Sequence, residues 1–139
     1  FFLDLWGGIP MHVAKEENSK EKNKASINLT ITYLKNKEPV MIFPEGKRND
    51  GNLLRGHLGI ARLALNSRVP VLPCGIIGAN KVLPKGKFFP RLARCEVKIG
   101  KQMHFAEYYG KKQTKKILEE VTRSIMKEIA RLIGQKYNH

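Results

Sequence analysis

The spacing of apolar residues along the chain predicts alternating helices and strands. Ser26 is a suitable N-cap for a helix that ends before Pro39, because proline disfavours helical geometry in the preceding residue. Residues 39–43 form a short, continuous apolar run, which is typical of a strand buried on both faces of a parallel sheet. A second, mostly apolar helix begins near Gly59, and residues 69–77 repeat the buried-strand pattern.

Two further elements are predicted toward the C-terminus. Residues 93–99 alternate well enough for a third strand. Within residues 111–136 apolar side chains recur every three or four positions, with most lysines and arginines off that stripe, so we expect a basic amphipathic helix with its stripe against the core. The stripe comprises Ile117, Val121, Ile125, Ile129 and Leu132. The order of elements predicts a single α/β domain, with a mostly parallel or mixed sheet covered by helices.

The composition fits a globular protein and gives it a strong positive charge. A chain of 139 residues, 42% hydrophobic and 27% charged, is long enough for one domain with a sizeable core. The 26 Lys and Arg outnumber the 12 Asp and Glu, for a net charge of +14. Nucleic acids, acidic lipid surfaces and phosphorylated metabolites are therefore the favoured partner classes.

The cysteines and the apolar runs are used to predict the cellular compartment of the protein. Cys74 and Cys95 form neither a disulfide framework nor a C-x-x-C pair, so we expect reduced, small core residues in the cytoplasm. No apolar run approaches the roughly eighteen residues of a membrane span, and residues 1–8 lack the pattern of a signal peptide. The apolar start without Met suggests a piece of a longer protein.

Residues 44–48, Pro-Glu-Gly-Lys-Arg, follow the first predicted strand, where open α/β sheets usually bind ligands. Gly46 permits close backbone approach, Arg48 offers a bidentate fork for phosphate, and Lys47 adds a point charge. Glu45 would repel a phosphate, so we expect it to orient Arg48 or to accept a proton from a hydroxyl group. Taken alone, these residues fit a solvated turn with an incidental ion pair equally well.

A nucleotide-binding P-loop is excluded for this turn. That motif needs a glycine five residues before its Gly-Lys pair and a Ser or Thr after it. These positions hold Met41 and Arg48.

The wider stretch resembles the family that acylates lysophosphatidic acid and glycerol 3-phosphate. The resemblance is carried by Val-Met-Ile-Phe-Pro-Glu-Gly-Lys-Arg-Asn at 40–49, Asp-Gly at 50–51, Gly-Ile-Ala-Arg-Leu-Ala at 59–64 and Val-Pro-Val-Leu-Pro-Cys-Gly at 69–75. Chain 1–139 would then be the C-terminal part of an acyltransferase domain.

The resemblance implies substrate-binding roles for five residues. Glu45, Gly46 and Arg48 match the family's loop, with Arg48 the expected ligand of the acceptor phosphate. Lys47 stands where the family usually has Thr, which keeps the site basic. His57 replaces a common Lys and would contact anionic substrate; a surface histidine at a helix start is the alternative interpretation.

The family's catalytic pair, a His followed five positions later by an Asp, is not found in the chain. His12 and Glu17 have this separation but the wrong acid, so a loop histidine is the simpler interpretation. Val13 occupies the position of a usual Arg, so acceptor binding would depend more on Lys47 and Arg48. We therefore predict no catalytic residue and no metal site in this chain.

The function implied by the resemblance is acyl transfer in phospholipid synthesis. A fatty acyl group would move from acyl-CoA or acyl carrier protein to the free hydroxyl of lysophosphatidic acid or a related glycerol phosphate. No cofactor is expected besides the acyl donor. Peripheral contact with an anionic membrane, at its cytoplasmic face, would suit a lipid acceptor and product.

Two other classes of function remain open. A nucleic-acid-binding module would explain the charge, but the chain has no zinc spacing, RNA-binding signature or helix-turn-helix pattern, so no nucleic acid partner is expected. A membrane-docking module would insert Phe88 and Phe89 and place basic residues at lipid headgroups, unless both rings fold back on the core. Those basic residues are Lys81, Lys85, Lys87, Arg91 and Arg94.

Overall fold

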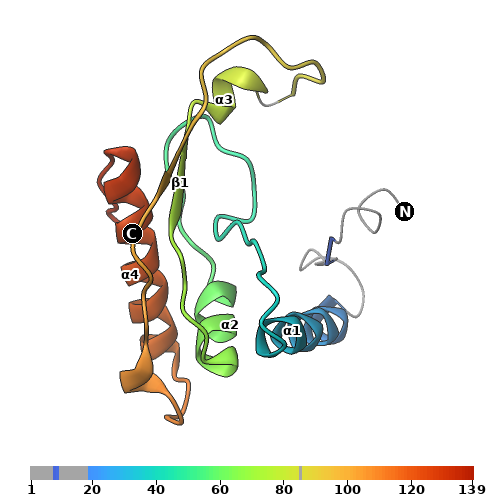
Figure 1. The fold of residues 1–139 in the computed structure, drawn as a ribbon, viewed down its shortest axis with the longest axis vertical. Coiled ribbons are helices and arrows are strands. Elements are labelled where there is room, and N and C mark those ends of the chain that lie inside the picture. The colour runs from blue at the N-terminus through green and yellow to red at the C-terminus, as the bar shows by residue number, and fades with distance from the viewer. Residues whose placement is uncertain (1–7, 10–18, 85) are drawn as a thin grey trace. The chain divides into compact units, whose positions relative to one another are not determined.

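The computed structural model describes residues 8–9, 19–84 and 86–139, with residues 19–22 described by their backbone alone. The chain divides into two compact units, Phe1–Met41 and Ile42–His139. The first unit contains helix α1 (Ser19–Lys35). The second contains α2 (Gly59–Ser67), β1 (Cys74–Ile77), α3 (Ala79–Val82), β2 (Glu96–Ile99), the 3-10 helix η2 (Ala106–Tyr108) and α4 (Lys115–Ile133) (Figure 1).

Helix α1 begins earlier than the apolar pattern predicts. Ser26 lies within the helix, so the prediction that it is the N-cap is wrong; its carbonyl accepts a hydrogen bond from Thr30 Oγ1 at 2.8 Å. The lysines and glutamate of residues 20–24 favour a helix through intrinsic propensity, which needs no apolar stripe. The predicted end is confirmed, because α1 stops at Lys35, before Pro39.

The core of the second unit lies between α2 and α4, which pack together (Figure 1). Thr114 caps α4 by accepting a hydrogen bond from the Ile117 amide, and Gly134 ends the helix in a left-handed conformation. The apolar stripe of α4 faces this core, as predicted, with Val121 and Ile125 buried. Burying each such side chain contributes about 1.5–3 kcal/mol. The other buried members of the cluster are Ile60, Ala61, Ala64, Leu65, Phe105 and Leu118.

The sheet of the described residues is an antiparallel pair, β1 with β2, in which Cys74 lies opposite Ile99. The third predicted strand is thus confirmed as β2. The expected parallel strands are not seen in the described part of the chain. Gly75 of β1 lies against α4, where an added Cβ would be 2.6 Å from Ile133 Cγ2. Because α4 covers only this face, the opposite face exposes Ile76 and Val97, and the predicted burial of residues 69–77 on both faces is wrong.

Residues 39–43 also depart from the prediction, because they form no strand. Met41 is 82% exposed, and Phe43 is exposed too. A strand needs a neighbouring backbone to satisfy its polar groups, and no strand of the described residues pairs with this run. The carbonyl of Phe43 instead accepts a hydrogen bond from the Gly46 amide within a turn.

Both cysteines are free, as expected, but the prediction that they are core residues is wrong, because both are exposed. Cys74 lies two residues before Ile76 on the uncovered face of β1. Cys95 directly precedes β2, whose residues are all exposed.

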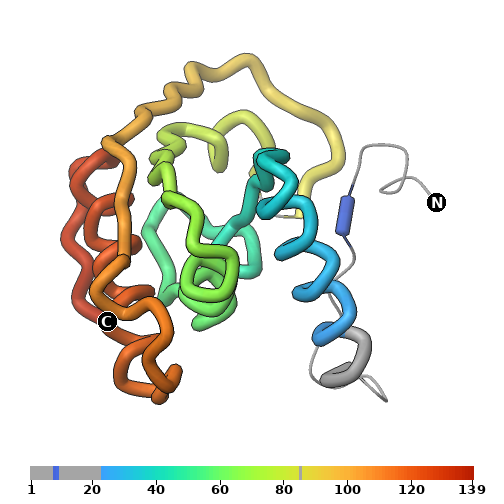
Figure 2. The backbone as a smooth tube through the Cα atoms, turned by 60° about the horizontal axis from the view of Figure 1, so that its bottom comes forward, coloured from blue at the N-terminus to red at the C-terminus, as the bar shows by residue number. Residues whose placement is uncertain are grey.

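The α/β fold class is confirmed by these elements. Among the described residues, no helix combines the length and apolar character needed to cross a membrane. The chain between α3 and β2, residues 83–95, is a loop, and Figure 2 shows its residues 86–95, yellow to orange, as a wide arc. We call this segment the basic loop, and residues 42–58, which lead into α2, the anchored loop.

Candidate functional site

The predicted phosphate-binding turn lies in the anchored loop and requires a glycine at position 46. Gly46 has φ +66°, a left-handed conformation that other residues adopt only with strain. A Cβ added there would lie 3.0 Å from His57 Cδ2, and the His57 amide donates a 2.8 Å hydrogen bond to the Pro44 carbonyl. The structure therefore brings together His57 and the turn, two parts of the chain that the sequence separates by about ten residues.

The Glu45 carboxylate forms hydrogen bonds within the anchored loop. Its Oε2 atom accepts hydrogen bonds from Asn49 Nδ2 at 2.8 Å and from the Leu54 amide at 2.7 Å. Hydrogen bonds to a carboxylate are stronger than neutral ones. No ion pair joins Glu45 to Arg48 within the described residues, in contrast to one of the expected roles. Glu45 thus shapes the loop that carries the cations.

Lys47 and Arg48 are exposed, and neither forms an ion pair with another described residue. The carboxylate of Glu45, two residues before Lys47, accepts hydrogen bonds from Asn49 and Leu54. Both cations are therefore available to an anion from solution, and the guanidinium can bind a phosphate through two parallel hydrogen bonds.

The anchored loop is tied to the chain segment that follows α4. Gln135 Oε1 accepts a hydrogen bond from the Leu53 amide at 2.8 Å, and Gln135 Nε2 donates to the Gly51 carbonyl at 2.6 Å. The Gly56 amide donates to the Tyr137 hydroxyl at 3.1 Å. These contacts join residues more than eighty positions apart, and sequence inspection did not identify them.

Gly56 fixes how closely the anchored loop approaches α4. A Cβ at this buried position would lie 2.7 Å from Met126 Cγ and 3.1 Å from Thr122 Cγ2. Only a residue without a side chain fits this spacing. The backbone next to His57 is thereby held directly on the helix.

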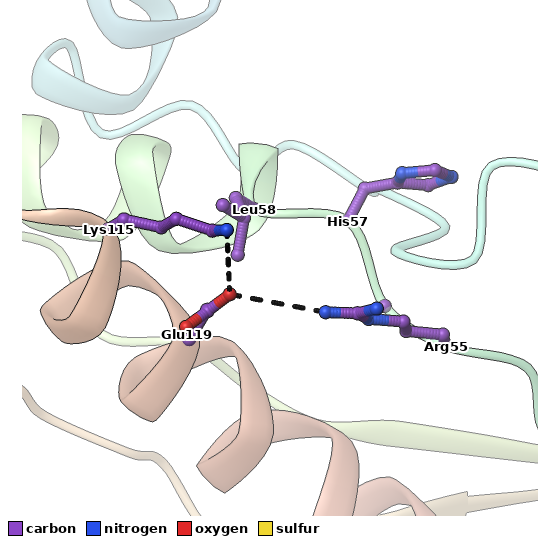
Figure 3. A pocket seen from close by; sticks show the side chains of 6 residues that line it. Arg55, His57, Leu58, Lys115 and Glu119 are labelled. Atoms are coloured by element: carbon purple, nitrogen blue, oxygen red, sulfur yellow. Dashed lines mark ion pairs between the residues drawn. The ribbon is translucent and has the colours of Figure 1, made fainter. Parts of the chain in front are cut away.

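A depression of about 320 Å³ adjoins the loop (Figure 3). Its lining consists of Arg55, Gly56, His57, Leu58, Lys115 and Glu119. Arg55 and Lys115 turn toward Glu119, with nitrogen to Oε1 distances of 4.0 and 3.9 Å, whereas the ring of His57 points away from this trio (Figure 3). Because these ion pairs are exposed, they contribute little to stability. His57 both lines the depression and touches Gly46, so the two features adjoin.

The structure thus brings together all five predicted site residues, from Glu45 to Arg48 with His57, on one folded loop. Two exposed cations beside an imidazole suit the binding of a small phosphorylated group. Three residues discussed from the sequence, His12, Val13 and Glu17, lie outside the described residues. The sequence Asn-Asp-Gly at residues 49–51 is typical of a turn. In the structure Asn49 Oδ1 accepts a hydrogen bond from the Gly51 amide at 2.9 Å.

Comparisons with known proteins agree with the α/β fold described above. The sequence model of the family described as acyltransferase matches residues 1–77, more than half of the chain. A comparison with curated proteins gave no match. The crystal structure of the 1-acyl-sn-glycerophosphate (LPA) acyltransferase PlsC from Thermotoga maritima is similar in fold, with a TM-score of 0.61 and 22% sequence identity. The similarity covers 90% of this chain but only 55% of that protein.

Proposed function

The chain belongs to the acyltransferase family, and from that premise we propose that it takes part in moving a fatty acyl group onto a glycerol phosphate. The donor would be acyl-CoA or acyl carrier protein. The acceptor would be the free hydroxyl of lysophosphatidic acid or of a related glycerol phosphate, as a step of phospholipid synthesis. The fold likeness to a 1-acyl-sn-glycerophosphate acyltransferase supports this choice of acceptor class.

One observation carries the proposal: the anchored loop presents, beside a histidine, two exposed cations that form no ion pair with a described residue. Arg48 is proposed to hold two phosphate oxygens of the acceptor, and Lys47 to add charge. Gly46 allows the backbone to approach the phosphate, and His57, which touches Gly46, contacts the acceptor from the side of the depression. Glu45 keeps the turn in shape through Asn49 and Leu54.

The chemical step needs a base that this sequence does not supply in the family's pattern. None of the four histidines is followed five positions later by Asp. In the proposed reaction a histidine held by an aspartate removes the acceptor hydroxyl proton, the oxygen attacks the thioester carbonyl, and the thiol leaves. We therefore assign this pair to residues outside these 139, and assign acceptor binding to this chain.

The proposed substrates also suggest a place for the reaction. A lysophospholipid acceptor and its product are membrane lipids, so the protein would work in peripheral contact with an anionic membrane, at its cytoplasmic face. The net charge of +14 suits such a surface.

Binding of glycerol 3-phosphate tests the assigned role of the anchored loop. Titration calorimetry of the protein should show Arg48→Ala weakening this binding about tenfold or more, because a charge-assisted pair of hydrogen bonds is lost. Arg62→Ala is the matched control, since Arg62 is an exposed arginine on α2, outside the loop. Equal weakening by both variants would mean that net charge, and not the loop, holds the phosphate.

Turnover provides the second arm of the same test. The 139-residue chain should transfer no acyl group from acyl-CoA or acyl carrier protein, whereas a longer form that carries a His and an Asp five residues apart should transfer it to lysophosphatidic acid. Robust turnover by the 139-residue chain would refute the assignment of the catalytic pair.

A further inference from the structure

In the described part of the basic loop, residues 83–84 and 86–95, the hydrogen bonds and contacts to the rest of the unit lie near its two ends. The Arg91 amide donates a 2.7 Å hydrogen bond to the Val82 carbonyl, and Gly78 lies directly against the Arg94 carbonyl, leaving no room for a side chain. Between these points the Lys87 amide donates to the Pro84 carbonyl at 3.0 Å and turns the chain. These contacts fix where the loop leaves α3 and where it enters β2, and residues 86–95 follow the arc in Figure 2.

Three large apolar side chains in this loop are open to solvent. Phe88 is 92% and Phe89 84% exposed, and Leu92 is fully exposed. The interpretation in which both rings fold back on the core is therefore wrong. Water disfavours the exposure of large apolar side chains, and several such residues in one short loop commonly mark a binding surface.

The charged residues of the sequence around these side chains are basic. Residues 79–95 contain five Lys and Arg and no Asp or Glu. The four described cations, Lys81, Lys87, Arg91 and Arg94, are exposed, and none forms an ion pair in the part of the chain that the structure describes. Lys85, the fifth, lies outside that part. The partner surface should therefore be anionic and should contain an apolar layer.

We propose that the basic loop docks the protein on an anionic lipid bilayer, with Phe88, Phe89 and Leu92 entering the acyl boundary and the flanking cations meeting the headgroups. Aromatic and aliphatic side chains beside lysine and arginine are what an interfacial lipid layer accommodates. A single nucleic acid strand would match the charge and could stack on the two rings, but it offers no apolar layer for Leu92. The inference deepens the proposed function, on whose lipid acceptor the choice of a bilayer rests.

Sedimentation with vesicles tests the apolar part of the proposal. The protein should bind vesicles of mixed phosphatidylcholine and phosphatidylglycerol, and Phe88→Ser combined with Phe89→Ser should reduce the partition constant about tenfold or more, since two inserted rings are lost. Ile99→Thr is the matched control, because Ile99 is an exposed apolar residue of β2 outside the loop. Circular dichroism verifies that each variant is folded.

The charge part needs a pair of variants with the same net charge. Lys87→Gln with Arg91→Gln should weaken binding to the mixed vesicles roughly twenty-five-fold, at about fivefold per cation near the surface. Lys112→Gln with Lys116→Gln neutralises two exposed lysines outside the basic loop, one just before α4 and one in its first turn, and should weaken it much less. Equal weakening by the two pairs would overturn the assignment to this loop.

Two results would refute the docking proposal altogether. One is unchanged vesicle binding by the double serine variant; the other is loss of single-strand nucleic acid binding in that variant while vesicle binding persists. No acyl donor is present in these measurements. Failure here therefore leaves acyl transfer untouched, and failure of the glycerol 3-phosphate test leaves docking untouched.

Discussion

The anchored loop and the basic loop lie in the same unit and share several features, but the structure holds them in opposite ways. Both are rich in cations, and each contains a glycine with positive φ, Gly46 at +66° and Gly86 at +79°. The anchored loop is bonded along its length by Glu45, Gln135 and Tyr137. The basic loop has bonds near its ends and one turn between them.

The difference indicates what each loop is suited to do. Side chains from the far end of the chain fix the backbone of the anchored loop, so little conformational entropy remains to be lost when a small phosphate binds. In the described part of the basic loop, large apolar and charged side chains are exposed, and its cations form no ion pair with another described residue. Such a surface suits a soft, extended partner better than a small rigid one.

Alanine at the two glycines is the strongest test of this contrast. Gly46→Ala should lower the free energy of unfolding by about 2 kcal/mol, because a left-handed non-glycine residue costs about 1–2 kcal/mol and the new Cβ would press on His57. Gly86→Ala has the same backbone strain but nothing within 4 Å, and the loosely held loop can relax, so its loss should be smaller. Urea unfolding gives both values.

The same two variants should separate in binding. Gly46→Ala displaces the His57 ring and should weaken glycerol 3-phosphate binding, whereas Gly86→Ala should leave it unchanged. If Gly46→Ala and Gly86→Ala lower stability and binding equally, the anchored loop is not held more rigidly than the basic loop.

Gln135 offers a test of the long-range anchor with a smaller expected effect. Gln135→Ala removes both hydrogen bonds to the anchored loop, at Leu53 and Gly51, and should lower the free energy of unfolding by about 1 kcal/mol, since the freed groups can reach water. Hydrogen exchange should also show faster exchange of the Leu53 amide. Gln102→Ala is the control, because Gln102 is exposed and makes no hydrogen bond within the described residues. An unchanged Leu53 amide would contradict the anchoring role.

Structural features that depend on interactions between residues near in sequence were predicted from the sequence, whereas features that depend on distant residues were not. Periodicity predicts α2 and α4 because a helix satisfies its own backbone and shows its buried face every three or four residues. The strand expected at residues 39–43 fails because strand formation depends on a partner that local sequence does not specify. The turn from Glu45 to Arg48 is identified by its motif, which is local.

The sequence pattern could not predict the long-range hydrogen bonds that hold the anchored loop in place. Gln135 and Tyr137 are ordinary polar residues after a helix, and only the fold places them beside Gly51 and Gly56. In the same way, the exposure of Phe88 and Phe89 depends on how the ends of the basic loop are held, so the sequence left insertion and burial both open.

The smallest effect is expected from pH and concerns the last turns of α4, from which the anchor at Gln135 extends. Arg131 donates to both carboxylate oxygens of Glu128, at 2.9 and 2.6 Å, and these hydrogen bonds lower the pKa of Glu128 below its ordinary value of 4.5. Because the pKa of Glu128 is lower in the folded state, its ionised carboxylate stabilises the fold fully at pH values above 4.5. This stabilisation is lost as the pH falls through the folded-state pKa. The melting temperature of wild type should therefore exceed that of Glu128→Gln near neutral pH, with the difference shrinking below pH 4.5. If the difference in melting temperature stays constant to the lowest pH, the charge of Glu128 does not contribute to stability. The end of α4 that carries Gln135 would then not depend on the Glu128–Arg131 ion pair.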